Sequence, residues 1–177
     1  MANAVIVIDM LRGFLEEGHP LYCGLGARTI IPRVAALLAR EEKKGSAIFF
    51  IADCHGPDDP EFNVFPPHCM MGSAEAEVIP ELYHYAASTT ITKQRYSGFF
   101  ETTLETTLKK IKPDKLIICG VCTDICVMHT VADARNRDYA VEVPADCVAS
   151  FDEEENRWAL KHMERILGAK VTGKEKR

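Results

Sequence analysis

A chain of 177 residues is long enough to enclose one sizeable core, and we expect a single domain over residues 1–177 with a flexible tail at 173–177. The composition, 47% hydrophobic and 27% charged, is ordinary for a globular protein. The net charge of -5 comes without a basic stripe, which argues against nucleic acid as a partner, and no apolar run is long enough to cross a membrane.

The first half of the chain alternates apolar strands with helices. Ala4–Ile8 is a β-branched run ending at Asp9 and predicts a buried strand. Apolar residues at helical spacing predict a helix over 30–44, and a second apolar strand is expected over 47–52. A long segment rich in proline and glycine, 56–72, follows this strand. Loops of that length inside a compact domain are usually functional or disordered.

The second half continues the alternation. The expected elements are a strand over 89–92, a helix over 100–111, a strand over 115–119, a helix that begins near Thr123 and reaches Ala134, a strand over 139–143, a helix over 153–167 and a short strand over 169–171. Nearly continuous apolar strands between helices are typical of a parallel sheet covered on both faces. We therefore predict an α/β fold: one doubly wound domain with a central parallel sheet of about six strands.

Polar residues stand where four of these strands end. They are Asp9, Asp53 with His55, Lys93, and the turn from Cys122 to Cys126. In doubly wound sheets, ligands bind at the carboxyl ends of the strands, so these residues are expected to share one pocket. A carboxylate beside a thiol can accept its proton, and an ammonium group stabilises the resulting anion. Each residue alone could equally be an ordinary cap or surface group.

The turn around Cys126 follows a buried strand and opens a helix. Thr123 is the expected N-cap, which places Cys126 in the first helical turn, where backbone N–H groups and the helix dipole favour a thiolate. Cys126 is therefore the candidate nucleophile, although most free cysteines are simply small buried hydrophobes. Cys122 and Cys126 do not have the spacing of a thioredoxin-like pair, so a redox dithiol is a weaker alternative.

A second group combines Asp53, His55, Glu61 and His68. In an extended segment, Asp53 and His55 point to the same side, and the following loop can bring Glu61 and His68 to them. Two imidazoles with two carboxylates suit Zn²⁺, Mn²⁺ or Fe²⁺, with an open position for water or substrate. Ordinary hydrogen-bonded loop histidines are the alternative. Flanking these positions, Cys54 and Cys69 are weaker candidates as ligands.

Several motifs resemble the isochorismatase-like cysteine hydrolases, over about residues 4–171. The stretch 120–127, Gly-Val-Cys-Thr-Asp-Ile-Cys-Val, resembles the nucleophile turn of that family. Segments 7–10 and 93–99 resemble its Asp and Lys segments. Within the superfamily, the segment from Asp53 to Cys69 resembles the metal loop of nicotinamidases, with Glu61 at a position where some nicotinamidases carry a third histidine. This loop is also shorter than in similar relatives.

The resemblance implies a nicotinamidase, which converts nicotinamide and water to nicotinate and ammonia in NAD salvage. It implies Asp9, Lys93 and Cys126 as catalytic residues, and backbone N–H groups of Cys122 and Cys126 as an oxyanion hole beside a cis peptide bond at Val121–Cys122. One divalent metal ion, with zinc first among the candidates, would be bound by Asp53, His55, Glu61 and His68. Phe14, Phe65 and Tyr96 would contact the substrate ring.

Two rival functions remain open on the sequence. One is a metal-independent relative that hydrolyses another small amide or a vinyl ether. The other is a non-catalytic binding or thiol-redox protein of the same fold. The seven scattered cysteines, an odd number, do not fit a disulfide scaffold, and we expect a cytoplasmic protein with reduced thiols. A homo-oligomer is compatible with the sequence.

Overall fold

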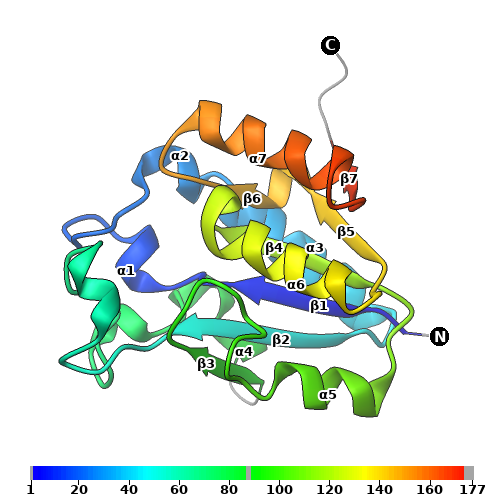
Figure 1. The fold of residues 1–177 in the computed structure, drawn as a ribbon, viewed down its shortest axis with the longest axis horizontal. Coiled ribbons are helices and arrows are strands. Elements are labelled where there is room, and N and C mark those ends of the chain that lie inside the picture. The colour runs from blue at the N-terminus through cyan, green and yellow to red at the C-terminus, as the bar shows by residue number, and fades with distance from the viewer. Residues whose placement is uncertain (1, 87–88, 174–177) are drawn as a thin grey trace.

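The structure, a computed structural model, describes residues 2–86 and 89–173 and is built on one parallel sheet (Figure 1). Its strands are β1 (Ala4–Ile8), β2 (Ala47–Asp53), β3 (Thr90–Lys93), β4 (Leu116–Val121), β5 (Val141–Pro144), β6 (Val148–Ala149) and β7 (Lys170–Thr172). Their order is β3-β2-β1-β4-β5-β7, with β6 also paired to β4. Every pairing is parallel. This confirms the predicted α/β fold with a central parallel sheet.

Helices cover both faces of the sheet. They are α1 (Arg12–Leu15), α2 (Gly24–Arg28), α3 (Ile31–Lys43), α4 (Tyr83–Ala86), α5 (Leu104–Ile111), α6 (Met128–Asn136) and α7 (Glu153–Arg165). Alternate residues of β1 enter two separate cores, because side chains along a strand point to opposite faces. Val5 and Val7 pack with residues of α3, whereas Ile6 and Ile8 pack with residues of α5, α6 and α7. In Figure 1, α6 lies in front of the sheet and α3 behind it.

One predicted helix begins later than expected, and one short strand was not predicted. The helix expected over 100–111 begins at Leu104, because Glu101 adopts a left-handed backbone conformation (φ 53°) that a helix cannot contain. Thr102 instead forms a turn, with its hydroxyl donating to the Gly98 carbonyl and accepting from the Leu104 N–H. The strand β6 was not predicted, since two residues carry no periodic pattern.

Gly120 allows β4 to approach β1 closely. Its φ of 114° is a conformation that L-residues with side chains rarely adopt, and an added Cβ would stand 1.9 Å from the Ile8 carbonyl oxygen. Gly120 is paired directly with Ile8, the last residue of β1. The turn that follows β4, with a cis peptide bond between Val121 and Cys122, is thereby placed next to Asp9.

The remaining expectations concern the chain end and membranes. The predicted tail at 173–177 lies, from residue 174 onward, outside the described residues. Among the helices of residues 2–86 and 89–173, none has the length and apolar character needed to span a bilayer.

Glu41 is a buried carboxylate at the end of α3 that ties three segments together. It accepts hydrogen bonds from Asn3 Nδ2 at 3.1 Å, Lys44 Nζ at 2.7 Å and Ser46 Oγ at 2.9 Å. Burial raises the pKa of Glu41, but these donors outweigh it and lower the pKa from 4.5 to about 2. The ionised form is therefore favoured in the folded state.

We predict that Glu41→Gln lowers the free energy of unfolding at neutral pH by about 2 kcal/mol, because it removes a buried ionised acceptor. Since the pKa is depressed on folding, this contribution is present above pH 4.5 and is lost as the pH falls toward about 2. Urea denaturation of both proteins across this range measures it. Glu42→Gln, at an exposed neighbouring position, is the control, and equal stability of Glu41→Gln and wild type at neutral pH would contradict the prediction.

Candidate active site

A cavity opens where the carboxyl ends of β1, β2 and β4 meet. Its lining residues are Asp9, Phe14, Leu21, Asp53, Glu61, Phe65, His68, Tyr96, Cys122, Ile125, Cys126 and Phe151. All three expected ring-contacting residues are among them. Leu21, Ile125 and Phe151 were not predicted, because apolar residues carry no signal in the sequence that separates a cavity wall from ordinary packing.

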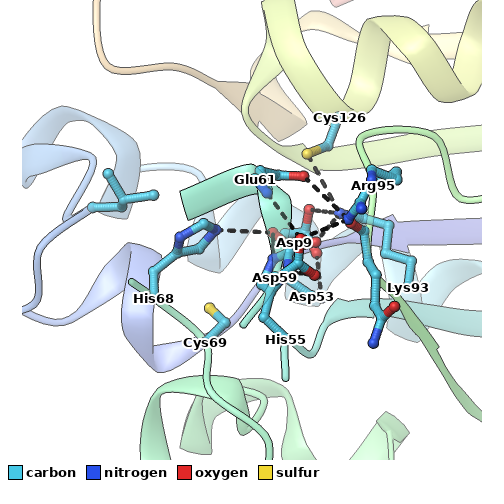
Figure 2. Close-up of polar contacts among 12 residues, drawn as sticks. Asp9, Asp53, His55, Asp59, Glu61, His68, Cys69, Lys93, Arg95 and Cys126 are labelled. Atoms are coloured by element: carbon cyan, nitrogen blue, oxygen red, sulfur yellow. Dashed lines mark hydrogen bonds and ion pairs between the residues drawn. The ribbon is translucent and has the colours of Figure 1, made fainter. Parts of the chain in front are cut away.

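The ammonium end of Lys93 reaches the aspartates and Cys126, as Figure 2 shows. Its Nζ is 2.8 Å from Asp9 Oδ2, donates a short hydrogen bond to Asp53 Oδ1, and donates to Cys126 Sγ at 3.5 Å. Lys93 and both carboxylate side chains are almost fully buried. Charge pairing is what makes their burial tolerable, because an unpaired buried charge is costly. The structure thus brings the predicted Asp, Lys and Cys together.

The two aspartates differ in acidity. Burial and the neighbouring charge of Asp53 raise the pKa of Asp9 to about 6, against the opposing effect of Lys93. Burial also acts to raise the pKa of Asp53, but Lys93 and the facing imidazoles of His55 and His68 hold it below its usual range. Asp53 therefore stays ionised, whereas Asp9 can exchange a proton near neutral pH, which is what a general base requires.

Cys126 lies in a π-helical turn, Thr123–Val127, immediately before α6. The expected N-cap role of Thr123 is wrong, since Cys122 is the N-cap and the buried Thr123 hydroxyl has no hydrogen-bond partner. Burial opposes the thiolate that an early helical position would favour. Burial raises the pKa of Cys126 well above its ordinary value, and the lowering effect of Lys93 does not offset it. Cys126 therefore rests as a thiol beside two carboxylates, one of which can accept its proton.

Cys122, the expected oxyanion-hole residue, follows the cis peptide bond and lines the cavity. Its Sγ is 3.5 Å from Cys23 Sγ, a buried thiol outside the nucleophile turn. This hydrogen bond and burial raise the pKa of the Cys122 thiol. The thiol that contacts Cys122 is thus Cys23, which removes the reason for treating Cys122 and Cys126 as a dithiol pair. All seven cysteines are free.

Three of the four predicted metal ligands form a buried group. Ligand atoms of Asp53, His55 and His68 all lie within 4.8 Å of one another. Both imidazole Nε2 atoms are 3.7 Å from Asp53 Oδ2, and in Figure 2 His68 points toward this carboxylate from the side opposite Lys93. Glu61 lines the same cavity but lies outside this group. Cys54 and Cys69 also lie outside it, and the Cys69 thiol donates to the Glu75 carbonyl.

The donor set fits a divalent cation. His68 Nδ1 lies 2.8 Å from the Pro66 carbonyl, which can only accept, so the Nδ1 atom carries hydrogen and Nε2 is left to face Asp53. His55 Nε2 and Glu61 Oε2 are buried without a hydrogen-bond partner. Buried polar atoms are normally satisfied, so unsatisfied imidazole and carboxylate atoms in one cavity indicate that a ligand belongs between them.

Protons compete for the same group. Burial lowers the pKa of His55, but the facing carboxylates of Asp53 and Asp59 outweigh it and raise the pKa to about 8. Burial and the charge of Asp53 raise the pKa of Glu61. Both shifts reflect the charge of Asp53, which attracts a proton or a cation.

Asp59 and Arg95 were not recognised in the sequence. Asp59 Oδ2 is 2.9 Å from His55 Nδ1, and Asp59 Oδ1 accepts from Arg95 Nη1 at 2.9 Å. The sequence offered one signal for Asp59, which is its position four residues after His55, a candidate metal ligand. This signal could not identify Asp59, because Asp58 is adjacent and the loop conformation decides which of the two side chains turns inward.

Comparison with known proteins agrees with this geometry. Residues 3–176 match the isochorismatase domain family. A pyrazinamidase/nicotinamidase from Streptococcus mutans is 31% identical, with a TM-score of 0.92 over 97% of this chain and 100% of that one. A zinc complex of the Pyrococcus horikoshii pyrazinamidase is 30% identical (TM-score 0.87, 97% and 99% covered). The N-carbamoylsarcosine amidase of Thermoplasma acidophilum is also 30% identical (TM-score 0.86, 100% and 99% covered).

All three solved structures are named as amidases, and the match extends over almost the whole chain. The resemblance noted in the sequence is therefore confirmed, and the common chemistry of these relatives is the hydrolysis of small amides. The chain belongs to the isochorismatase family.

Proposed function

We propose that this protein is a nicotinamidase, a metal-assisted cysteine amidohydrolase that converts nicotinamide and water to nicotinate and ammonia. One observation carries the proposal: Asp53 contacts Lys93 through one carboxylate oxygen and faces His55 and His68 with the other. A thiol with its acid–base partners is thereby joined to a cation-binding group in one cavity. A metal-independent amidase would have no use for the second group.

The metal ion would be held by Asp53, His55 and His68, with Glu61 as a further ligand. Zn²⁺ is the first candidate, and Mn²⁺ or Fe²⁺ would also suit nitrogen and oxygen donors. When bound, it would supply a contact for the pyridine nitrogen and so orient the ring. Phe14, Phe65 and Tyr96, which line the cavity, suit the faces of a flat heterocycle.

The first half of the reaction forms a thioester. Asp9 accepts the proton of Cys126, and Lys93 stabilises the resulting thiolate through its contact with Sγ. The thiolate attacks the carboxamide carbon, and the N–H groups of Cys122 and Cys126 donate to the oxygen that becomes negative. The C–N bond then breaks, and the proton held by Asp9 passes to the departing ammonia.

The second half regenerates the thiol. Asp9, ionised again, accepts a proton from a water molecule that attacks the thioester carbon. The C–S bond breaks, nicotinate leaves, and Cys126 recovers its proton from Asp9. A pKa of about 6 for Asp9 suits both directions of transfer, because proton donors and acceptors act best near the working pH.

The cellular setting is proposed on the same basis. Seven free cysteines are in keeping with a reducing compartment, so we propose a cytoplasmic enzyme whose product supplies NAD salvage.

We predict that the purified protein releases ammonia from nicotinamide and that Cys126→Ala lowers the rate at least ~10³-fold, because it removes the thiol that forms the proposed thioester. Cys147→Ala, which removes a buried thiol outside the cavity, should retain the wild-type rate. The measurement is enzyme-coupled ammonia detection with equal amounts of each folded protein. Absence of activity in the wild type under metal-replete conditions would refute the nicotinamidase assignment.

We predict that exhaustive chelation abolishes most of this activity and that added Zn²⁺, Mn²⁺ or Fe²⁺ restores it, because ring orientation is lost with the cation. Metal content and the rate of nicotinamide hydrolysis are measured on the same samples before and after dialysis. Full activity in metal-free protein would instead favour the metal-independent rival.

We predict that Lys93→Met lowers the free energy of unfolding by about 3–5 kcal/mol, because it leaves two buried carboxylates without their counter-charge. Activity should fall as well, since Cys126 loses its contact with the Lys93 ammonium group. Lys109→Met removes a lysine that is 67% exposed and should cost little. Urea denaturation compares the two variants, and equal stabilities would show that Lys93 does not hold the site together.

A further inference from the structure

Asp59 lies in the loop after β2, and both of its carboxylate oxygens contact neighbouring residues. Its side chain is 4% exposed. Asp59 Oδ2 lies 2.9 Å from His55 Nδ1, and Asp59 Oδ1 accepts from the Glu61 backbone N–H and from Arg95 Nη1, each at 2.9 Å (Figure 2). Two of these partners, His55 and Glu61, are proposed metal ligands, and the third supplies the positive charge that balances the carboxylate.

The contact with Asp59 fixes which nitrogen of His55 carries hydrogen. An ionised carboxylate can only accept hydrogen bonds, so His55 Nδ1 must be the donor. In the neutral ring, Nε2 then has a free lone pair. That atom is buried, has no hydrogen-bond partner and faces Asp53 Oδ2 at 3.7 Å. Asp59 therefore presents to the cavity the form of His55 that can bind a cation.

Asp59 also controls its other two neighbours. The bond from the Glu61 N–H holds the backbone of that residue at the start of the short helix Pro60–Asn63. Arg95 Nη1 is 2.9 Å from Asp59 Oδ1 but 4.0 Å from Glu61 Oε2. By binding Arg95, Asp59 keeps this guanidinium from pairing fully with Glu61, so the Glu61 carboxylate stays available.

We propose that Asp59 is a positioning residue for the metal ion, which acts by selecting the His55 tautomer, placing Glu61 and occupying Arg95. This inference rests on the proposed metal-assisted function and adds a residue that touches neither substrate nor metal. Partners that hydrogen-bond to a metal-binding histidine orient the ring, and their loss typically weakens metal binding by about 10–100-fold. His68 receives the same support from the Pro66 carbonyl.

Three variants test the proposal through zinc affinity, measured without substrate by competition with a chromophoric chelator. Asp59→Ala should raise the dissociation constant about 10–100-fold. Asp59→Asn should raise it about 10-fold, because the amide retains one acceptor but loses the charge that holds Arg95. Asp58→Asn changes the exposed residue directly before Asp59. It is the matched control and should bind zinc as the wild type does. Thermal unfolding checks that each variant is folded.

The Asn variant separates positioning from a merely structural role. If Asp59 served only as the N-cap of the helix Pro60–Asn63, Asn would replace it fully, since Asn and Asp cap equally well. Zinc binding by Asp59→Asn equal to that of the wild type would therefore overturn the proposal. Wild-type zinc affinity no better than that of His55→Ala would overturn it as well.

Nitrogen NMR of metal-free protein at alkaline pH, where imidazole is neutral, supplies a second readout. The His55 hydrogen should lie on Nδ1 in the wild type and be shared between the ring nitrogens in Asp59→Ala. An unchanged tautomer in Asp59→Ala would overturn the proposal. Neither readout requires turnover, so a wild type whose zinc affinity depends on Asp59 but that leaves nicotinamide intact would refute the proposed substrate and not this inference.

Discussion

The buried ammonium of Lys93 is the interaction on which the rest of the site depends. Its positive charge is what allows Asp9 and Asp53 to be buried together, and its third contact is with the Cys126 thiol. Lys93 ends β3, Asp53 ends β2 in direct register with it, and Asp9 follows β1. The carboxyl ends of three adjacent parallel strands thus position three charged side chains together, and no long loop is needed to bring them into contact. Cys126, the proposed nucleophile, lies in the turn that follows the next strand, β4.

Asp53 connects this charge cluster to the cation-binding group. One oxygen of Asp53 contacts Lys93 and the other faces two imidazoles. A change in charge on one side of Asp53 therefore shifts the pKa of the groups on the other side. The same carboxylate helps to raise the pKa of Asp9 and of His55. Burial has the largest effect on the pKa of Cys126 and raises it, so the proposed mechanism needs a group that accepts the thiol proton.

Sequence reasoning recovered what local patterns encode and missed what depends on loop conformation or burial. Buried parallel strands are continuous apolar runs, so their positions and the residues at their carboxyl ends could be predicted. The start of α5 could not, because it is set by the left-handed conformation of Glu101. The role of Asp59 depends on how a loop folds, and the acidity of Cys126 depends on solvent exclusion. Neither quantity has a signature in residue spacing.

The bare backbone at Gly120 has a consequence for engineering. Walls such as Phe14, Phe65 and Tyr96 can be varied to admit a differently shaped amide, since side chains at a cavity lining have room to be replaced. Position 120 offers no such freedom, because a single methyl group there would collide with the main chain of β1. A mutant library aimed at new specificity should therefore diversify the walls and hold this one codon constant.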